Sequence, residues 1–270
     1  MLHIICALKC EATPLIDYYR LEKITDKVTF PCYTDRHGNI TLTISHPGKT
    51  NAAAATSFTH EYFKCGKNDC WLNIGLAGHQ SMEIGQVALA HKIEDSGNGT
   101  TWYPQIVFTP PCPTLALKTL DKPSVKYEES MFDMEASGFY SISSRIAFAE
   151  LAHCLKIISD NCTRPAEKPD KIFFSSLIEQ QLRTIDQLVN LILALSAELE
   201  QAYEHSQYFE TCIKRWHFTR YEQYVLSGLL NRWRVLMPDD DPVANTININ
   251  NSKEFIALLE RKLDSSFIRF

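Results

Sequence analysis

The first 160 residues alternate short apolar runs with amphipathic segments and turn signals. Continuous apolar runs without polar alternation predict buried strands at 2–8, 70–78 and 155–160. Directly after the first of these, apolar positions in 9–19 take up helical spacing. Strands interleaved with helices predict an α/β domain built in layers, rather than separate α and β halves.

The same patterns place the remaining elements. Further strands are expected at 28–35, 40–46, 84–93, 114–120 and 131–135, and further helices at 49–64, 136–153 and 173–200. The polar, proline-containing stretch 161–170 predicts a loop.

The last 70 residues have a different pattern, with only weak strand signals. They contain an aromatic and basic run at 214–238, an acidic turn and a final amphipathic segment at 254–263. We therefore expect two parts, an α/β domain over 1–200 and a mainly helical extension over 201–270.

Composition narrows the possible classes. The chain has 270 residues, of which 45% are apolar and 22% charged, as in soluble globular proteins whose core needs no disulfide. Its nine cysteines form no CxxC pair, which argues against a metal cage and favours reduced thiols in a cytoplasmic protein. No signal peptide or membrane-spanning run is predicted. The net charge of −5 argues against a general nucleic-acid binder.

Three acidic residues follow predicted strands. Glu11 comes after the first strand, Glu135 ends the run MFDME, and Asp160 ends LKIISD. Since ligands collect at the carboxyl ends of strands in open α/β sheets, these carboxylates are candidates for one crevice. The turn Gly75-Leu76-Ala77-Gly78 also ends a strand, and its glycines would let backbone amides approach a ligand closely.

Taken in order, these segments resemble the nucleoside phosphorylase and nucleosidase superfamily, specifically its methylthioadenosine/S-adenosylhomocysteine nucleosidase branch. The matching pieces are ICALKCEA, HPGKTNAA, NIGLAGHQSMEIGQVALAHKI, FDMEASGF and IISDN. The resemblance covers about three quarters of the chain. It implies a three-layer αβα sandwich with a mixed central sheet, a nucleoside as the small-molecule partner, assembly as a homodimer, and no metal or organic cofactor.

The resemblance also implies roles for individual residues. Asp160 would protonate the departing purine, with Ser159 orienting it. Glu135 would bind the ribose hydroxyls and favour a positively charged sugar in the transition state, and Met134 would pack on ribose or base. Glu11 would position and deprotonate the attacking water. Gly78, Ala77 and the amides around them would form the floor of the site.

The nucleophile is either water or phosphate. Hexameric phosphorylases of the superfamily carry an arginine two residues before the Gly-rich turn, where this chain has Asn73, a further candidate for substrate binding. An ionised Glu11 would also repel phosphate. Hydrolysis is therefore the favoured reaction. Lys49 or a residue of a partner subunit could still supply the missing charge, so phosphorolysis stays an alternative.

One departure from the family bears on the substrate. The segment between GLAGHQ and FDMEAS is short, and no residue matches the base-stacking position. Thr119, Asp121 and Phe108 fall near it, so the base and the 5′ substituent stay open. A protein that uses the pocket only to bind nucleosides is a further alternative.

The extension lies outside the resemblance. Basic and aromatic residues interleave in 214–234, as in segments that stack on single-stranded nucleic acid. The simpler interpretation is that the aromatics pack on the main domain while the basic groups stay in water. Nucleic acid is therefore not expected as a partner, although this segment does not exclude it.

Overall fold

The computed structural model describes residues 1–26, 28–165, 170–203, 208–244, 246 and 249–266. The chain forms two compact units, Met1–Glu198 and Leu199–Phe270. Four residues of the predicted loop 161–170 and several of the predicted extension lie outside the described residues, namely 166–169, 204–207, 245, 247–248 and 267–270.

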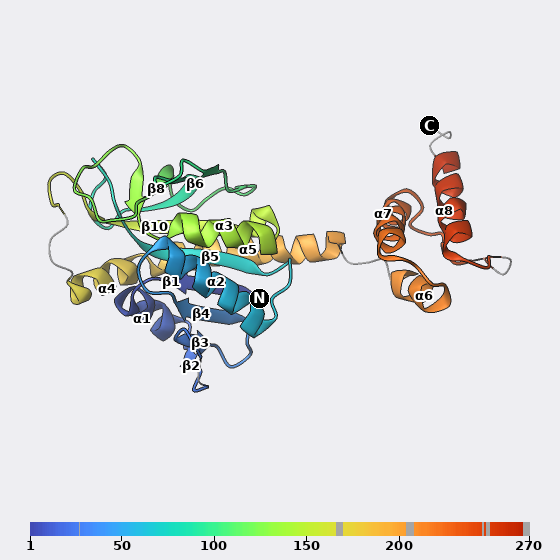
Figure 1. Cartoon of the computed structure of the whole chain (residues 1–270), viewed down its shortest axis with the longest axis horizontal. Helices are drawn as coiled ribbons and strands as arrows, with labels where there is room; N and C mark the ends of the chain where they lie inside the picture. Colours follow the sequence, from blue (N-terminus) through green and yellow to red (C-terminus); the bar gives the residue numbers. More distant parts are fainter. Residues whose placement is uncertain (27, 166–169, 204–207, 245, 247–248, 267–270) are drawn as a thin grey trace. The chain divides into compact units, whose positions relative to one another are not determined.

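A ten-stranded sheet forms the centre of the first unit (Figure 1). Its strands are β1 (Leu2–Cys6), β2 (Glu22–Lys23), β3 (Cys32–Thr34), β4 (Ile40–Ile44), β5 (Cys70–Gly78), β6 (Val87–Asp95), β7 (Thr101–Trp102), β8 (Thr114–Thr119), β9 (Met131–Asp133) and β10 (Ala152–Asp160). The helices of this unit are α1 (Lys9–Tyr18), α2 (Lys49–Phe63), α3 (Ala136–Ile146), the 3-10 turn η1 (Ala149–Leu151), α4 (Lys171–Gln180) and most of α5 (Leu182–Tyr203).

Parallel and antiparallel pairs are combined in this sheet, as predicted. β1 lies between β4 and β5 and is parallel to both. Three further pairs are parallel, namely β5 with β10, β6 with β8, and β8 with β9. Two pairs are antiparallel, namely β10 with β6 and β9 with β5. These five strands thus curl into a closed ring, which brings the ends of β5, β9 and β10 together.

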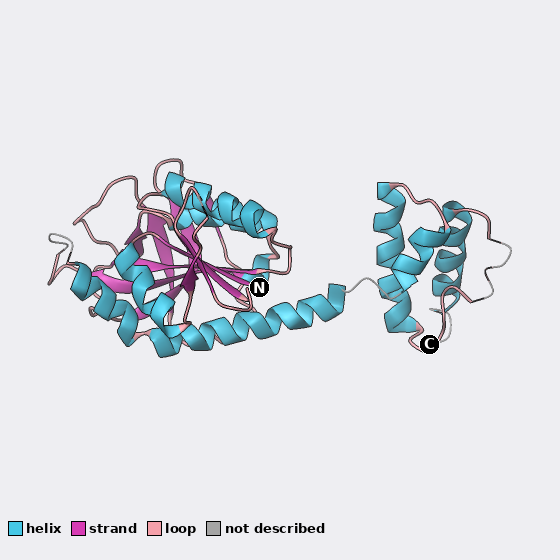
Figure 2. Ribbon diagram, turned by 90° about the horizontal axis from the view of Figure 1, so that it is seen from below, coloured by secondary structure: helices cyan, strands magenta, loops and turns pink. Residues whose placement is uncertain are grey.

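Helices cover both faces of the sheet, which confirms the three-layer sandwich (Figures 1 and 2). α1 packs with α4 on one face, and α2 packs with α3 on the other. The continuous apolar run of β1 is buried at every position, because helices cover both sides of this strand.

Two predicted helices differ from the structure. The predicted helix 173–200 is interrupted at Gln181, where the side chain donates a 2.8 Å hydrogen bond to the carbonyl of Gly85, a contact that local pattern does not reveal. The predicted helix 136–153 ends at Ile146. The strand β10 begins at Ala152 and takes over the apolar residues that were assigned to the helix.

The second unit holds α6 (Tyr208–Arg215), α7 (Arg220–Leu236) and α8 (Ser252–Ser266). Trp216 stacks on Phe255 with ring centroids 4.6 Å apart, and Trp233 is 2% exposed. Both indoles also donate hydrogen bonds, to the carbonyls of Ile249 and Asp240. Trp216, Phe218 and Trp233 therefore belong to a core within this unit, which corrects their predicted packing on the main domain. Tyr221 and Tyr224 are exposed.

Among the described residues, no helix combines the length and apolar character that crossing a bilayer requires.

Candidate active site

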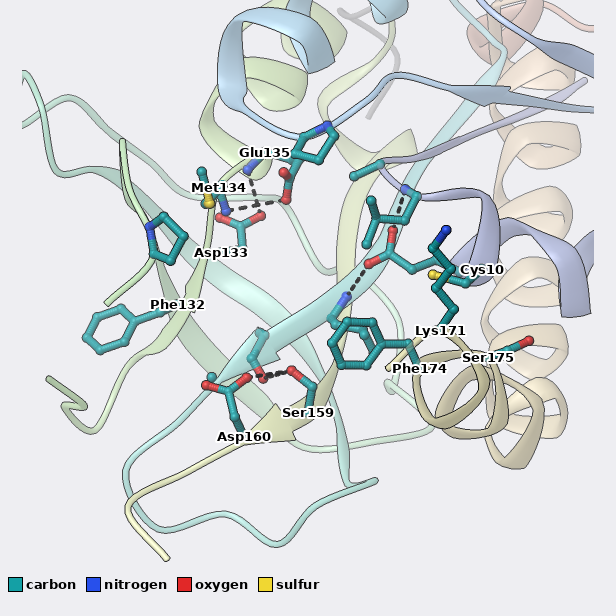
Figure 3. Close-up of a pocket in the computed structure, with 18 of the residues that line it drawn as sticks. Cys10, Phe132, Asp133, Met134, Glu135, Ser159, Asp160, Lys171, Phe174 and Ser175 are labelled. Atoms are coloured by element: carbon teal, nitrogen blue, oxygen red, sulfur yellow. Dashed lines mark hydrogen bonds between the residues drawn. The ribbon is translucent and has the colours of Figure 1, made fainter. Parts of the chain in front are cut away.

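A cavity of about 1290 Å³ opens at the carboxyl ends of β1, β5 and β10. Glu11, Glu135 and Asp160 all line it, although they come from three distant parts of the sequence. Figure 3 shows Glu135 and Asp160 in this cavity. The parallel pairing of β1, β5 and β10 brings Glu11 and Asp160 to the same edge of the sheet, because parallel strands end together. Glu135 follows β9, which runs antiparallel to β5 and pairs with it at Gly78, the last residue of β5.

Asp160 is the last residue of β10, and the strand contains a bulge just before it. The register with β5 shifts between Ile158 and Asp160, so that Asp160 lies opposite Gly78 and Ser159 is the extra residue. Ser159 donates a 2.6 Å hydrogen bond from its hydroxyl to Oδ1 of Asp160. The phenol of Tyr127 donates one of 2.7 Å to Oδ2. These two hydrogen bonds hold the carboxyl group of Asp160 in one orientation.

Glu135 lies at the junction between β9 and α3. Its Oε1 accepts a 2.8 Å hydrogen bond from the backbone N–H of Gly48, which has a φ of +103° at the start of α2. Glycine adopts a φ of this kind readily because it has no side chain. The glycine at position 48 therefore allows the backbone turn that directs its N–H toward Glu135. Burial, with added repulsion from Asp133, raises the pKa of Glu135 to about 7.

A buried lysine lies among these acids. Lys156, in the middle of β10, is 1% exposed, and its Nζ is 2.9 Å from Oδ2 of Asp133, which is itself buried. Although burial opposes the charge, the carboxylates of Asp133 and Glu135 raise the pKa of Lys156 above its usual value. Lys156 therefore supplies a fixed positive charge that offsets the acids of the cavity.

Asp133 connects this cation to the helix that follows. Its Oδ2 accepts hydrogen bonds from the backbone N–H groups of Glu135 and Ala136, and its Oδ1 accepts one of 2.7 Å from Thr119. These bonds satisfy otherwise unpaired amides at the start of α3. Sequence reasoning missed both Asp133 and Lys156. The only available signal was a lysine within the apolar run LKIIS.

Glu11 lies in the first turn of α1, so its carboxylate is at the positive end of the helix dipole. Its two oxygens accept hydrogen bonds from the backbone N–H groups of Leu8 at 2.8 Å and Leu76 at 3.1 Å. Burial nevertheless raises the pKa of Glu11, with Lys156 acting in the opposite direction. The carboxylate thus bridges α1 and β5 at the edge of the cavity.

The other predicted residues divide into two groups. Met134, Ser159, Ala77 and Gly78 line the same cavity as the acids. Asn73 is not among the lining residues. It is 1% exposed, and its side-chain amide donates a 3.0 Å hydrogen bond to the carbonyl of Ile5, which ties β5 to β1.

None of the three residues suggested for the base-stacking position faces the cavity. Thr119 donates to Asp133, Asp121 pairs with Lys49, and Phe108 packs edge-on against His153 at the opposite end of β10. The apolar lining comes instead from Leu120, Pro123, Val125, Phe132, Ile172 and Phe174.

Lys49, considered as a source of charge for phosphate, is already engaged. Its Nζ is 2.7 Å from a carboxylate oxygen of Asp95 and 2.7 Å from one of Asp121. Among the described residues that line the cavity there is no arginine, and the cations are Lys9 and Lys171. Lys9 donates a 3.1 Å hydrogen bond to the hydroxyl of Tyr33.

Comparison with known proteins tests the architecture. No family model matches the chain, and no curated protein matches its sequence. Solved structures do match. A 5′-methylthioadenosine nucleosidase of Arabidopsis thaliana superposes with a TM-score of 0.58 at 16% identity, over 71% of this chain and 95% of the other. The first unit has the nucleosidase fold.

Two Helicobacter pylori proteins are similar to the chain in the same way. A mutant of the nucleosidase MTAN with 5′-methylthioadenosine in its active site has a TM-score of 0.55 at 14% identity, covering 72% of this chain and 97% of that one. A futalosine hydrolase mutant has a TM-score of 0.53 at 14% identity, covering 70% and 98%. The superfamily resemblance seen in the sequence is therefore confirmed for the fold, in a divergent chain.

Proposed function

We propose that this chain hydrolyses the N-glycosidic bond of a purine nucleoside. The observation that carries the proposal is the convergence of Glu11, Glu135 and Asp160 on one cavity of a nucleosidase fold. Glycosidic cleavage needs a group that protonates the leaving base, a negative group near the developing positive charge of the sugar, and an activated nucleophile. The three carboxyl groups can divide these tasks among them.

Asp160 is the proposed acid. Ser159 and Tyr127 hold its two oxygens, and the apolar side chains of Phe132 and Val125 line the same cavity. A flat, apolar purine suits such a wall, and its N7 would take the proton from Asp160 as the bond breaks. The base would then leave as a neutral molecule.

Glu135 and Met134 form the proposed sugar site. The ribose 2′ and 3′ hydroxyls would donate to the Glu135 carboxylate, which Gly48 already holds in place. Its negative charge also stabilises the oxocarbenium-like sugar of the transition state. Oε1 already accepts from the backbone N–H of Gly48 and Oε2 from that of Met134, which leaves one lone pair on each oxygen as an acceptor for the sugar.

Glu11 is the proposed base for water. A buried carboxylate with a raised pKa accepts a proton more readily than an ordinary one. Phosphate is disfavoured as the nucleophile, because the carboxylate of Glu11 would repel it and Lys49 is held by two acids. Lys9 and Lys171 at the cavity keep phosphorolysis as the second candidate reaction.

The test is release of free base from methylthioadenosine, S-adenosylhomocysteine, adenosine and inosine, each with and without phosphate. We expect release without phosphate, lost in Asp160→Asn and kept in Asp239→Asn, a matched change at an exposed aspartate of the second unit. Release only with phosphate would replace hydrolysis by phosphorolysis. Binding of nucleosides without any release would favour the non-catalytic alternative.

A further inference from the structure

A second cluster of reactive side chains lies at the opposite edge of the sheet. His3 belongs to β1 near its amino end, Asp69 immediately precedes β5, and Cys65 follows α2. One ligand atom from each, a ring nitrogen, a thiol sulfur and a carboxylate oxygen, lies within 4.8 Å of the other two. Since the acids of the active site follow the carboxyl ends of the strands, this cluster is separate from that cavity.

The strongest observation concerns His3. Its ring is fully buried, and Nδ1 forms a 2.7 Å hydrogen bond with the hydroxyl of Thr41. Nε2 has no hydrogen-bond partner in the structure, and the nearest carboxylate oxygen, on Asp69, is 3.6 Å away, too far for a hydrogen bond. A buried polar atom without a partner costs free energy, so something that binds Nε2 would stabilise the fold.

The surrounding ligands suit a metal ion. Burial lowers the pKa of His3 although Asp69 acts in the opposite direction, and this keeps the ring in the neutral form that coordinates metals. Asp69 is held in place by a 2.6 Å hydrogen bond from the backbone N–H of Gly66 and by the amino group of Met1 at 2.8 Å. Thr41 fixes the other ring nitrogen of His3, as the partners of metal-bound histidines do.

We infer that His3, Cys65 and Asp69 form a binding site for a zinc-like divalent cation. One nitrogen, one sulfur and one oxygen ligand match the preferences of Zn²⁺, with a fourth tetrahedral position left for water or a further group. Burial raises the pKa of Cys65 to about 12, and a bound dication reverses this by stabilising the thiolate. The ion would tie the end of α2 to the beginnings of β1 and β5.

Cobalt is the probe for this site, because Co²⁺ replaces Zn²⁺ and its spectrum reports both geometry and sulfur ligation. We expect tag-free protein to bind one equivalent of Co²⁺ with the strong visible bands of a tetrahedral site and a near-ultraviolet thiolate charge-transfer band. The charge-transfer band should disappear in Cys65→Ser and persist in Cys32→Ser, a matched change at another buried cysteine of the first unit.

Competition with Zn²⁺ then measures affinity. Loss of an outer partner of a ligand weakens metal binding by about 10- to 100-fold, so His3→Ala and Cys65→Ser should each weaken it more than about 100-fold. Zn²⁺ should also raise the melting temperature of the wild type and leave both variants unchanged. Weak, octahedral Co²⁺ spectra, or equal affinity in Cys65→Ser, would overturn the inference. Circular dichroism of each variant without metal separates lost binding from lost folding.

Discussion

The phenol of Tyr127 donates a 2.7 Å hydrogen bond to Oδ2 of Asp160, the same oxygen that a methyl group at position 78 would overlap. Tyr127 belongs to the segment between β8 and β9. His79 and Gln80 hold the next residues of this segment through the carbonyls of Glu129 and Glu128. A residue of this connecting segment thus binds the proposed acid directly.

Removal of the Tyr127 hydroxyl should raise activity. A base that approaches Asp160 at Oδ2 must displace this hydrogen bond, whose net value is about 0.5–1.5 kcal/mol. We expect Tyr127→Phe to increase kcat/KM by about two- to tenfold, because one tenfold step corresponds to about 1.4 kcal/mol. Steady-state base release measures this effect. A clear decrease in Tyr127→Phe would instead make the hydroxyl a helper of the acid.

The raised pKa of Glu135 predicts how stability depends on pH. The native carboxyl has a pKa of about 7, against an ordinary value of 4.5, so the native state holds its proton more tightly than the unfolded chain. This contribution is fully present below about 4.5 and is lost as the pH rises through about 7. Relative to Glu135→Gln, the wild type should lose up to about 3 kcal/mol of unfolding free energy across this window.

Urea denaturation of both proteins from about pH 5 to pH 8 measures this difference. Glutamine is a suitable comparison, because its amide oxygen can still accept the hydrogen bond from Gly48 and it carries no titrating proton. Parallel stability curves for the two proteins would show that Glu135 titrates near its ordinary value.

The buried pair of Lys156 and Asp133 should be far more important for stability than a surface pair. Lys156→Met leaves the buried carboxylate of Asp133 without its cation, and the expected cost is about 3–5 kcal/mol. Lys92→Met, which breaks the partly exposed pair of Lys92 with Glu94, should cost less than about 1 kcal/mol. Denaturant unfolding of both variants tests the contrast, and similar losses would contradict it.

A double variant shows whether the charge itself is responsible. Lys156→Met combined with Asp133→Asn removes both charges, so part of the stability lost in Lys156→Met should return. A cost equal to the sum of the two single changes would mean that Lys156 acts through packing alone.

Gly138 permits the close approach of α3 to α2. A methyl group at this position would overlap the backbone carbonyl of Lys49, and backbone cannot give way as a flexible side chain can. We expect Gly138→Ala to destabilise the first unit by more than about 1 kcal/mol, as overpacking does. It should also weaken activity, since Gly48 and Glu135 lie at the same helix junction.

The matched control is Gly228→Ala in α7. No atom lies within 4 Å of a methyl group at that position, so the change should stabilise the helix by about 0.5–1 kcal/mol. Thermal unfolding of each variant supplies the comparison. Equal effects at the two glycines would rule out the steric explanation.

The sequence by itself determined the layered α/β architecture of the first unit and most of its strands. β1 and β10 are mostly apolar because helices or neighbouring elements bury them on both faces. A run of apolar residues of this kind can be recognised directly in the sequence. Short motifs likewise pointed to Glu11, Glu135 and Asp160, all of which line the same cavity. The helical character of the extension was also visible, as confirmed by α6, α7 and α8.

Only the tertiary structure decided which distant groups meet. The break between α4 and α5 depends on a hydrogen bond from Gln181 to Gly85, and the aim of Asp160 depends on a bulge opposite Gly78. Local periodicity reports whether a residue is buried, and it carries no information about the partner that satisfies a buried charge. For that reason the pairing of Lys156 with Asp133, the contact of Tyr127 with Asp160 and the cluster around His3 appeared only when the strands were assembled.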